Sequence, residues 1–243
     1  MANATNRPFS SEFENQLREA VMEYSMLKHP FYVAWTEGKL SKAVLAEYAK
    51  QYYAHVRAFP TYVSGVHSRC EDVSIRQQLL ENLIEEERGE DNHPELWLRF
   101  AEALGVTRED VKSAELLPAT RASVASMKSL TQNEDYRAGL AALLAYESQI
   151  PEVAQTKREG LKDFYEIEDE RAISFFRVHE TIDLLHQHVE MQGLEAECQS
   201  PAAQSCAIAA AREAARALWG FLDGVSSAYL VAPAVTTNAA SGV

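Results

Sequence analysis

A chain of 243 residues, 47% of them hydrophobic, is long enough to bury one large core, so we expect a single folded domain. The formal net charge of −13 at pH 7 repels phosphate backbones and anionic lipid heads, which excludes nucleic acid and membrane surfaces as expected partners. The N-terminus has no signal-peptide pattern, and no apolar run approaches the roughly 20 residues that span a bilayer, so we expect a cytoplasmic protein.

The first half of the chain carries clear helix signals. Ser11-Glu-Phe-Glu and Ser74-Ile-Arg-Gln each predict a capped helix start. Between them, residues 39–70 keep apolar side chains three and four apart for about seven turns, with Pro60 positioned to kink the helix. A shorter helix is expected over residues 94–104, with proline near its start and glycine after its end.

The second half continues the helical pattern. Residues 120–130 predict a short helix, residues 135–161 and 169–191 predict two long ones, and residues 201–224 predict the last. Strict two-residue alternation is missing, so we expect an all-α bundle of about seven helices. The predicted domain spans residues 10–225, between flexible ends at residues 1–9 and 226–243, which are small or polar without a sustained period.

The three cysteines are odd in number and lack C-x-x-C spacing, which argues against a disulfide framework and against a zinc knuckle. We therefore expect Cys70, Cys198 and Cys206 to be buried thiols.

Three polar residues project from one apolar helix face. At 100° per residue, Asp183 lies about 40° from His179, and His186 about 20° from it on the other side. A buried unpaired carboxylate is costly and needs a cation or dense hydrogen bonding. A histidine–aspartate pair inside the bundle and a metal site both satisfy this need, and satisfied core histidines are the commoner case.

Two other segments offer matching groups. Glu86 and His93 are seven residues apart, about 20° apart in projection on a continuous helix. Glu90 is a rival to Glu86, because Glu90-Asp-Asn-His93 has the Glu-x-x-His spacing of ferritin-like di-iron proteins. Glu147 is the only acidic residue in an otherwise apolar run that begins at Ala138. Carboxylates that bridge two hard cations, with imidazoles at the terminal positions, are typical of dinuclear sites in helical bundles.

Long stretches of the chain resemble a known family. HPFYVAW, YAKQYYAHVRAFPTYVSGVHSRCED, AYESQIP and the spacing H-x3-D-x2-H resemble the chlamydial protein associating with death domains and its bacterial relatives, over roughly residues 20–225. The resemblance implies a haem-oxygenase-like bundle, related in fold to thiaminase-II-type and pyrroloquinoline-quinone-C-type proteins, that binds two metal ions, either two irons or iron with manganese. Its ligand pattern falls on Glu86, His93, Glu147, His179, Asp183 and His186.

The resemblance also implies an activity, which is self-sacrificing formation of p-aminobenzoate, a folate precursor, from O2 with an external reductant. The aromatic ring would come from Tyr32 and the amino group from Lys157. From the residues alone, Tyr32 is an ordinary core tyrosine, and Lys157 lies about 15 Å along an ideal helix from Glu147, so spacing does not bring it to the metals. Tyr48 and Tyr146 are secondary catalytic candidates.

Two other classes of function remain open on the sequence. The first is a conventional enzyme of the pyrroloquinoline-quinone-C or thiaminase type acting on a bound small molecule, and the second is a non-catalytic interaction module. A thiaminase-type reaction needs a cysteine nucleophile, and Cys70 beside two acidic residues is poorly placed to be a stabilised thiolate. Relatives of this fold commonly dimerise, so a homodimer is expected.

Overall fold

The computed structural model describes residues 11–230, apart from the side chain of Leu184, and in this range every regular element is a helix. The elements are α1 (Glu12–Met22), the 3-10 helix η1 (Met26–Lys28), α2 (Pro30–Thr36), α3 (Lys42–His67), α4 (Val73–Glu87), α5 (His93–Ala103), α6 (Arg108–Lys112), α7 (Pro118–Thr131), α8 (Tyr136–Glu147), α9 (Ile150–Tyr165), α10 (Glu170–His179), α11 (Ile182–Glu197) and α12 (Pro201–Tyr229). The all-α prediction is confirmed.

Most helix starts follow local capping chemistry. Ser11 caps α1, since its Oγ accepts a hydrogen bond from the Glu14 backbone N–H at 3.0 Å. The expected start at Ser74 is wrong, because Asp72 is the residue that caps α4, accepting from the Ile75 N–H at 2.9 Å. Pro60 lies inside α3, as expected.

Both long helices predicted in the second half are broken. The segment 135–161 divides into α8 and α9 because the ring of Pro151 would clash with the Glu147 carbonyl in a continuous helix, so α8 ends at Glu147. The segment 169–191 divides into α10 and α11 at Glu180 and Thr181, with Thr181 at φ −123° and ψ −41°. No glycine or proline marks this second break in the sequence.

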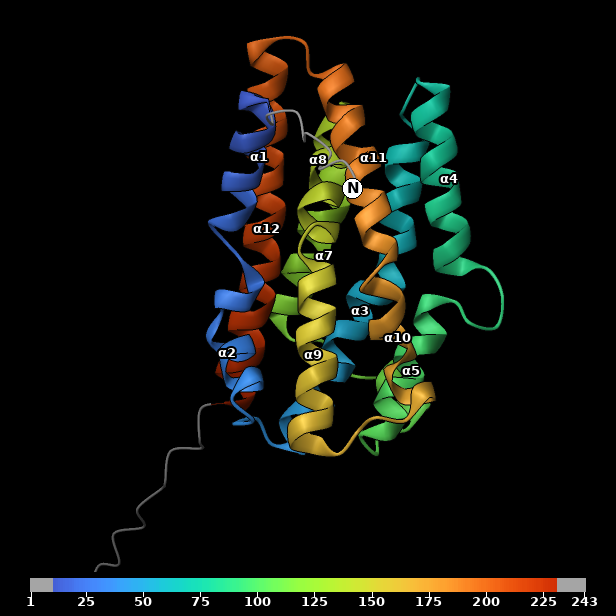
Figure 1. Ribbon diagram of the computed structural model, residues 1–243, viewed down its shortest axis with the longest axis vertical. Helices are drawn as coiled ribbons and strands as arrows, with labels where there is room; N and C mark the ends of the chain where they lie inside the picture. The colour runs from blue at the N-terminus through green and yellow to red at the C-terminus, as the bar shows by residue number, and fades with distance from the viewer. Residues whose placement is uncertain (1–10, 231–243) are drawn as a thin grey trace, which may run out of the picture.

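The breaks divide the bundle into two levels. In Figure 1, α8 lies above α9, α11 lies above α10, and α4 lies above α5. The chain also leaves the helical path between Glu87 and His93, where Gly89 adopts φ +89°, a value that side chains disfavour. All three pairs of helices therefore have their junctions at one level of the bundle.

The core is built around α3, α8 and α12. α12 packs against α8, α7 and α1, and its small buried side chains, such as Ala207, Ala211 and Ala214, allow close approach of neighbouring helices. The apolar face of α12 is thus used inside the chain. α12 continues to Tyr229, whereas the predicted domain ended at residue 225.

Two further expectations can be compared with the structure. Cys70 and Cys198 are buried, but Cys206 is exposed on α12, so the prediction of three buried thiols is wrong for Cys206. Among the described residues, no helix combines the length and apolar character needed to cross a membrane. Of the predicted flexible ends, residues 1–9 and 231–243 lie outside the described residues, whereas residues 226–229, which were also predicted to be flexible, belong to α12.

Candidate metal centre

Two groups of three side chains form the candidate centre. Glu86, His93 and His179 are buried and have potential ligand atoms within 4.8 Å of one another. Glu86 lies near the end of α4, His93 is the first residue of α5, and His179 is the last residue of α10. His93 Nδ1 lies 2.7 Å from Glu86 Oε1 but not in hydrogen-bond geometry, and the imidazole centroids of His93 and His179 are 4.4 Å apart. We call these three residues the first group.

The second group is Glu147, Asp183 and His186, again buried and with potential ligand atoms within 4.8 Å of one another. Glu147 is the last residue of α8, and Asp183 and His186 lie in the first turns of α11. His186 Nδ1 lies 3.2 Å from Glu147 Oε1 and 3.7 Å from Asp183 Oδ1.

The structure brings the six candidate ligands together by a different route from the one inferred from helical projection. His179 does not share a continuous helix with Asp183 and His186, because the break at Glu180 and Thr181 lies between them, and it joins the first group instead. Glu86 and His93 likewise flank a non-helical segment. The helix breaks, rather than a helical stripe, direct these side chains toward one another.

Both groups border the same small cavity of about 20 Å³, which has room for about one water-sized sphere. Five of the six candidate ligands line it, all except His186. The other lining residues are Tyr52, Val56, Phe59, Tyr146, Ile150 and Phe175. The cavity lining therefore combines carboxylates and imidazoles with aromatic and aliphatic side chains.

Orphaned polar atoms in both groups fit a cation. Glu147 Oε2, Asp183 Oδ2 and His93 Nδ1 are buried and have no hydrogen-bond partner within residues 11–230. Buried polar groups are normally satisfied, and removing a partner from a buried charge is strongly destabilising. Carboxylate and imidazole donors suit divalent iron and manganese, so the residues present fit a pair of such ions.

Hydrogen bonds to outer partners orient the rings of two histidines. His179 Nδ1 donates to the Phe175 carbonyl at 2.7 Å, which leaves Nε2 without a proton. His186 Nε2 lies 2.8 Å from Glu85 Oε2, so a proton on Nε2 would leave Nδ1 facing Glu147 and Asp183. An orienting carboxylate or carbonyl of this kind is the usual outer partner of a metal-binding histidine.

The pKa values reflect burial and crowding of acids. Burial raises the pKa of Asp183 to about 7, although the nearby His186 opposes this shift. Burial disfavours the charged form of His186, but the neighbouring Asp183 and Glu147 carboxylates outweigh burial and raise its pKa to about 11. Burial holds the pKa of His179 well below its usual value, with His93 adding repulsion. A neutral His179 is the form that binds metal.

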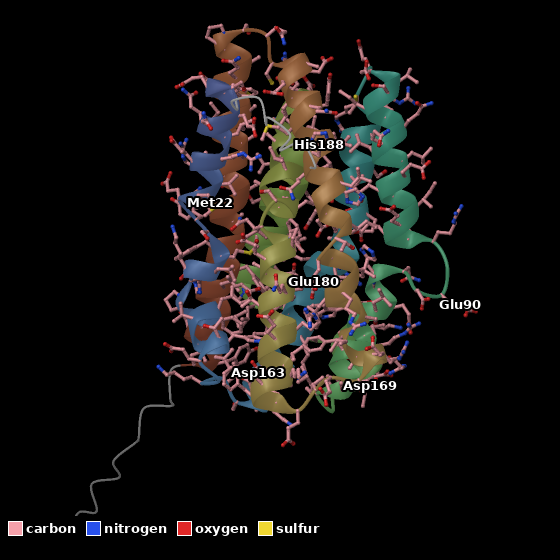
Figure 2. The ribbon with its side chains drawn as sticks, in the orientation of Figure 1. Met22, Glu90, Asp163, Asp169, Glu180 and His188 are labelled. Carbon is pink, nitrogen blue, oxygen red and sulfur yellow. The ribbon has the colours of Figure 1, made fainter. Side chains whose placement is uncertain are left out.

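The structure separates the candidate acids of the EEERGED segment. Glu90 is exposed on the loop between α4 and α5 and points away from the bundle, as Figure 2 shows, so it does not approach the candidate ligands. Glu87 is also exposed, whereas Glu85 is partly buried against His186.

Sequence reasoning missed two residues beside the second group. Asn82 donates to Glu147 Oε1 at 2.9 Å. Glu190 is 2% exposed, and its carboxyl lies close enough to Glu147 for each to shift the pKa of the other. Burial, then Glu147, raise the pKa of Glu190 well above its usual range. The available signal was the spacing of Glu190 four residues after His186, which places both on one helix face.

The remaining catalytic candidates form a second polar region, which we call the tyrosine–lysine cluster: Tyr32, Tyr48 and Lys157. Lys157 Nζ donates to Tyr48 Oη at 2.7 Å, and the Tyr48 and Tyr32 hydroxyls are 3.0 Å apart. The Lys157 Nζ lies 5.2 Å from the Tyr32 ring centroid. All three side chains are buried.

Local packing explains how Tyr32 and Lys157 meet. A Cβ on Gly160 would lie 2.6 Å from the Trp35 ring, so this glycine lets α2 pack closely on α9. Trp35 Nε1 also donates to the Lys157 carbonyl at 3.3 Å. The Lys157 side chain is buried, with its Nζ between the rings of Tyr32 on α2 and Tyr48 on α3.

Burial leaves Lys157 only partly charged at neutral pH. Burial lowers its pKa to about 7, and its Nζ is surrounded by aromatic rings, the nearest centroid being that of Tyr52 at 4.8 Å. An amine with a pKa near 7 has a free lone pair and is nucleophilic at physiological pH.

Tyr52 and Tyr146 connect the two polar regions. Their hydroxyls are 2.7 Å apart, and both line the cavity beside the candidate ligands. The Tyr52 ring stacks on Tyr48, with centroids 5.5 Å apart and planes inclined by 20°. Tyr52 was not among the sequence candidates, since nothing in the pattern of α3 distinguishes it from a packing residue.

Comparison with known proteins places the chain in a family. Residues 46–219 match the model of a family described as iron-containing redox enzymes. The 4-aminobenzoate synthase of Nitrosomonas europaea is 43% identical over 90% of this chain and 93% of its own length. The 4-aminobenzoate synthase of Chlamydia trachomatis serovar D is 40% identical over 87% of this chain and 90% of its own length.

The fold is similar to that of a solved domain of unknown function from Shewanella denitrificans, which is described as having a haem-oxygenase-like fold. The match has a TM-score of 0.73 at 20% identity and covers 92% of this chain and 95% of the solved chain. The chain belongs to the family of iron-containing redox enzymes and has a haem-oxygenase-like fold. The predicted resemblance is confirmed at the level of family and fold.

Proposed function

We propose that this protein forms p-aminobenzoate in a self-sacrificing oxidation, taking the ring from Tyr32 and the amino nitrogen from Lys157. The observation that carries the proposal is the position of the Lys157 amine, 5.2 Å from the Tyr32 ring centroid in a buried cluster where burial lowers the pKa of the lysine to about 7. The names of the two synthases similar to this chain support the product. Each chain would act once, because its own side chains are consumed.

Two metal ions, either two irons or iron with manganese, would be held by the first group, Glu86, His93 and His179, and the second group, Glu147, Asp183 and His186. When bound, they would supply the oxidising power, using O2 and electrons from an external reductant. The family description supports the presence of iron.

The protein's own residues hold the reactants. Tyr48 accepts a hydrogen bond from Lys157 and contacts the Tyr32 hydroxyl, so it keeps the amine and the phenol in one place. The surrounding rings exclude water, which preserves the neutral amine and protects reactive species from quenching. Two groups fixed in this way react as intramolecular partners, with effective molarities that reach about 10⁵ M in well-oriented cases.

The test is a single-turnover reaction of protein labelled with ¹⁵N-lysine or ¹³C-tyrosine, loaded with Fe(II) or with Fe(II) and Mn(II), and given O2 and reductant. We expect labelled p-aminobenzoate without any added aromatic compound, at no more than about one per chain. Tyr32→Phe and Lys157→Arg should abolish formation of p-aminobenzoate. The control variants Tyr24→Phe and Lys162→Arg should still form it, and Lys162 is an exposed lysine on α9, the helix that carries Lys157.

Other results would favour other functions. Unlabelled product, or turnover only with an added small molecule, would indicate a conventional enzyme of the pyrroloquinoline-quinone-C or thiaminase type. Burial raises the pKa of the Cys70 thiol, which disfavours a thiaminase-like nucleophile. No metal uptake at all would indicate a non-catalytic interaction module. Cytoplasmic location and a homodimer stay predictions, and gel filtration checks the second.

A further inference from the structure

Glu190 is a buried acid whose neighbouring carboxyl, that of Glu147, is another acid. It lies four residues after His186 on α11, is 2% exposed, and neither of its carboxylate oxygens has a hydrogen-bond partner within residues 11–230. Buried carboxylates are normally paired or bound to a metal ion. The proposed reaction uses none of its atoms, so Glu190 needs its own explanation.

The surroundings of Glu190 offer no free cationic side chain. It lines a cavity of about 30 Å³ together with Asn82, Glu85 and His186, and no lysine or arginine is among the lining residues that the structure describes. His186 already faces Glu85 through Nε2 and Glu147 through Nδ1. Asn82 donates its amide to Glu147. Each nearby donor is therefore already engaged with another acid.

We propose that Glu190 is a further ligand of the metal ion held by Glu147, Asp183 and His186. The proposal rests on the metal centre of the proposed function. It gives the second group three carboxylates and one imidazole, against one carboxylate and two imidazoles in the first group. Carboxylate-rich sites favour hard cations, so the second group is suited to Mn²⁺, the ion used in the test.

A competing explanation is that Glu190 only shares a proton with Glu147. Glutamine has the shape of a protonated glutamic acid and keeps a donor, so Glu190→Gln would preserve that arrangement. A ligand role requires the carboxylate, which glutamine lacks. The same substitution therefore separates the two explanations.

The experiment titrates apo wild-type protein, Glu190→Gln and the control Glu195→Gln with Mn²⁺ under anaerobic conditions. Bound ions are counted by equilibrium dialysis and free Mn²⁺ is followed by electron paramagnetic resonance. Glu195 is an exposed acid on the same helix, and glutamine can still accept its hydrogen bond from Ser11.

We expect two ions in the wild type and in Glu195→Gln. In Glu190→Gln the affinity for one of the two should fall at least about tenfold, the scale on which metal sites respond to lost partners. Wild-type affinity at both positions in Glu190→Gln would overturn the proposal.

A crystal structure of the Mn²⁺-loaded wild type tests the same point without a substitution, should Glu190→Gln fail to fold. Coordination of the ion by a Glu190 oxygen supports the proposal, and a Glu190 carboxyl that stays clear of the ion overturns it. The outcomes also separate this inference from the proposed function. If the wild type binds neither Mn²⁺ nor Fe(II), both the ligand role of Glu190 and the proposed function are refuted. If Glu190→Gln binds Mn²⁺ more weakly but the wild type forms no p-aminobenzoate, only the proposed reaction is refuted.

Discussion

The two buried polar regions of this protein differ in how well the chain satisfies them. In the metal region, carboxylates and imidazoles from three helix junctions crowd together, and several of their atoms have no protein partner among the described residues. In the tyrosine–lysine cluster, each polar side-chain tip has a partner, since Lys157 donates to Tyr48 and Tyr48 contacts Tyr32. The proposed function accounts for this difference: the region that would receive metal ions is left unsatisfied by the chain, whereas the region whose own side chains would react is complete without a ligand.

The difference extends to charge. The metal region holds more acid than it can neutralise, whereas the cluster holds a lysine whose pKa burial lowers to about 7. Introduced changes should therefore separate the regions: losing an acid should affect metal binding, and changing the cluster should affect chemistry or stability with the metals still bound.

The largest expected effect is in Asp183→Asn. It removes a buried carboxylate of the second group, so one of the two metal ions should be lost and the p-aminobenzoate yield should fall at least about 100-fold. Metal content and single-turnover yield measure this. Asp163→Asn, an exposed acid on α9 that Figure 2 labels, should match the wild type. Full metal content in Asp183→Asn would contradict the assignment of the second group.

The pH dependence of stability tests the cluster next. The pKa of Lys157 falls from about 10.4 in the unfolded chain to about 7 when buried, so between these values the unfolded state binds more protons. The cost of burying the lysine is full below pH 7 and declines as the pH rises, so this group makes the free energy of unfolding increase by up to about 1.4 kcal/mol per pH unit. Denaturant titrations of apo wild type and Lys157→Met from pH 7 to 10 measure the difference. Equal slopes in the two proteins would mean that Lys157 is charged in the folded state.

The hydroxyl of Tyr48 should have a smaller effect. Tyr48→Phe removes the acceptor for Lys157 and the contact with Tyr32 while keeping the ring that stacks on Tyr52. A lost hydrogen bond of this strength corresponds to about 1.4 kcal/mol, so the single-turnover rate should fall about tenfold with metal content unchanged. A loss of metal in Tyr48→Phe would show that the two regions are not separable.

The sequence predicted the all-α fold, because helical period and capping are local signals, and it offered all six side chains of the metal region as candidates, with the family resemblance selecting Glu86 over Glu90. It did not predict the breaks before Ile150 and Ile182, and projection on continuous helices therefore placed His179 on the same stripe as Asp183 and His186. Pro151 marks the first break, but nothing local marks the second. The contact of Tyr32 with Lys157 depends on α2 packing on α9 through Gly160 and Trp35, a contact between distant segments that no periodicity contains.

The smallest effect should come from the link between the regions. Tyr52→Phe leaves the Tyr146 hydroxyl buried without its partner, and Tyr146→Phe does the same to the Tyr52 hydroxyl. Each single change should lower the free energy of unfolding by about 1–2 kcal/mol. The double variant removes both hydroxyls together and leaves neither unpaired, so it should cost less than the sum of the single changes. Denaturant unfolding of the four apo proteins at one pH gives the coupling energy, which we expect to reach about 1 kcal/mol. Strictly additive costs would mean that the two hydroxyls, although 2.7 Å apart, are not energetically coupled, and that the metal region and the cluster are joined by packing alone.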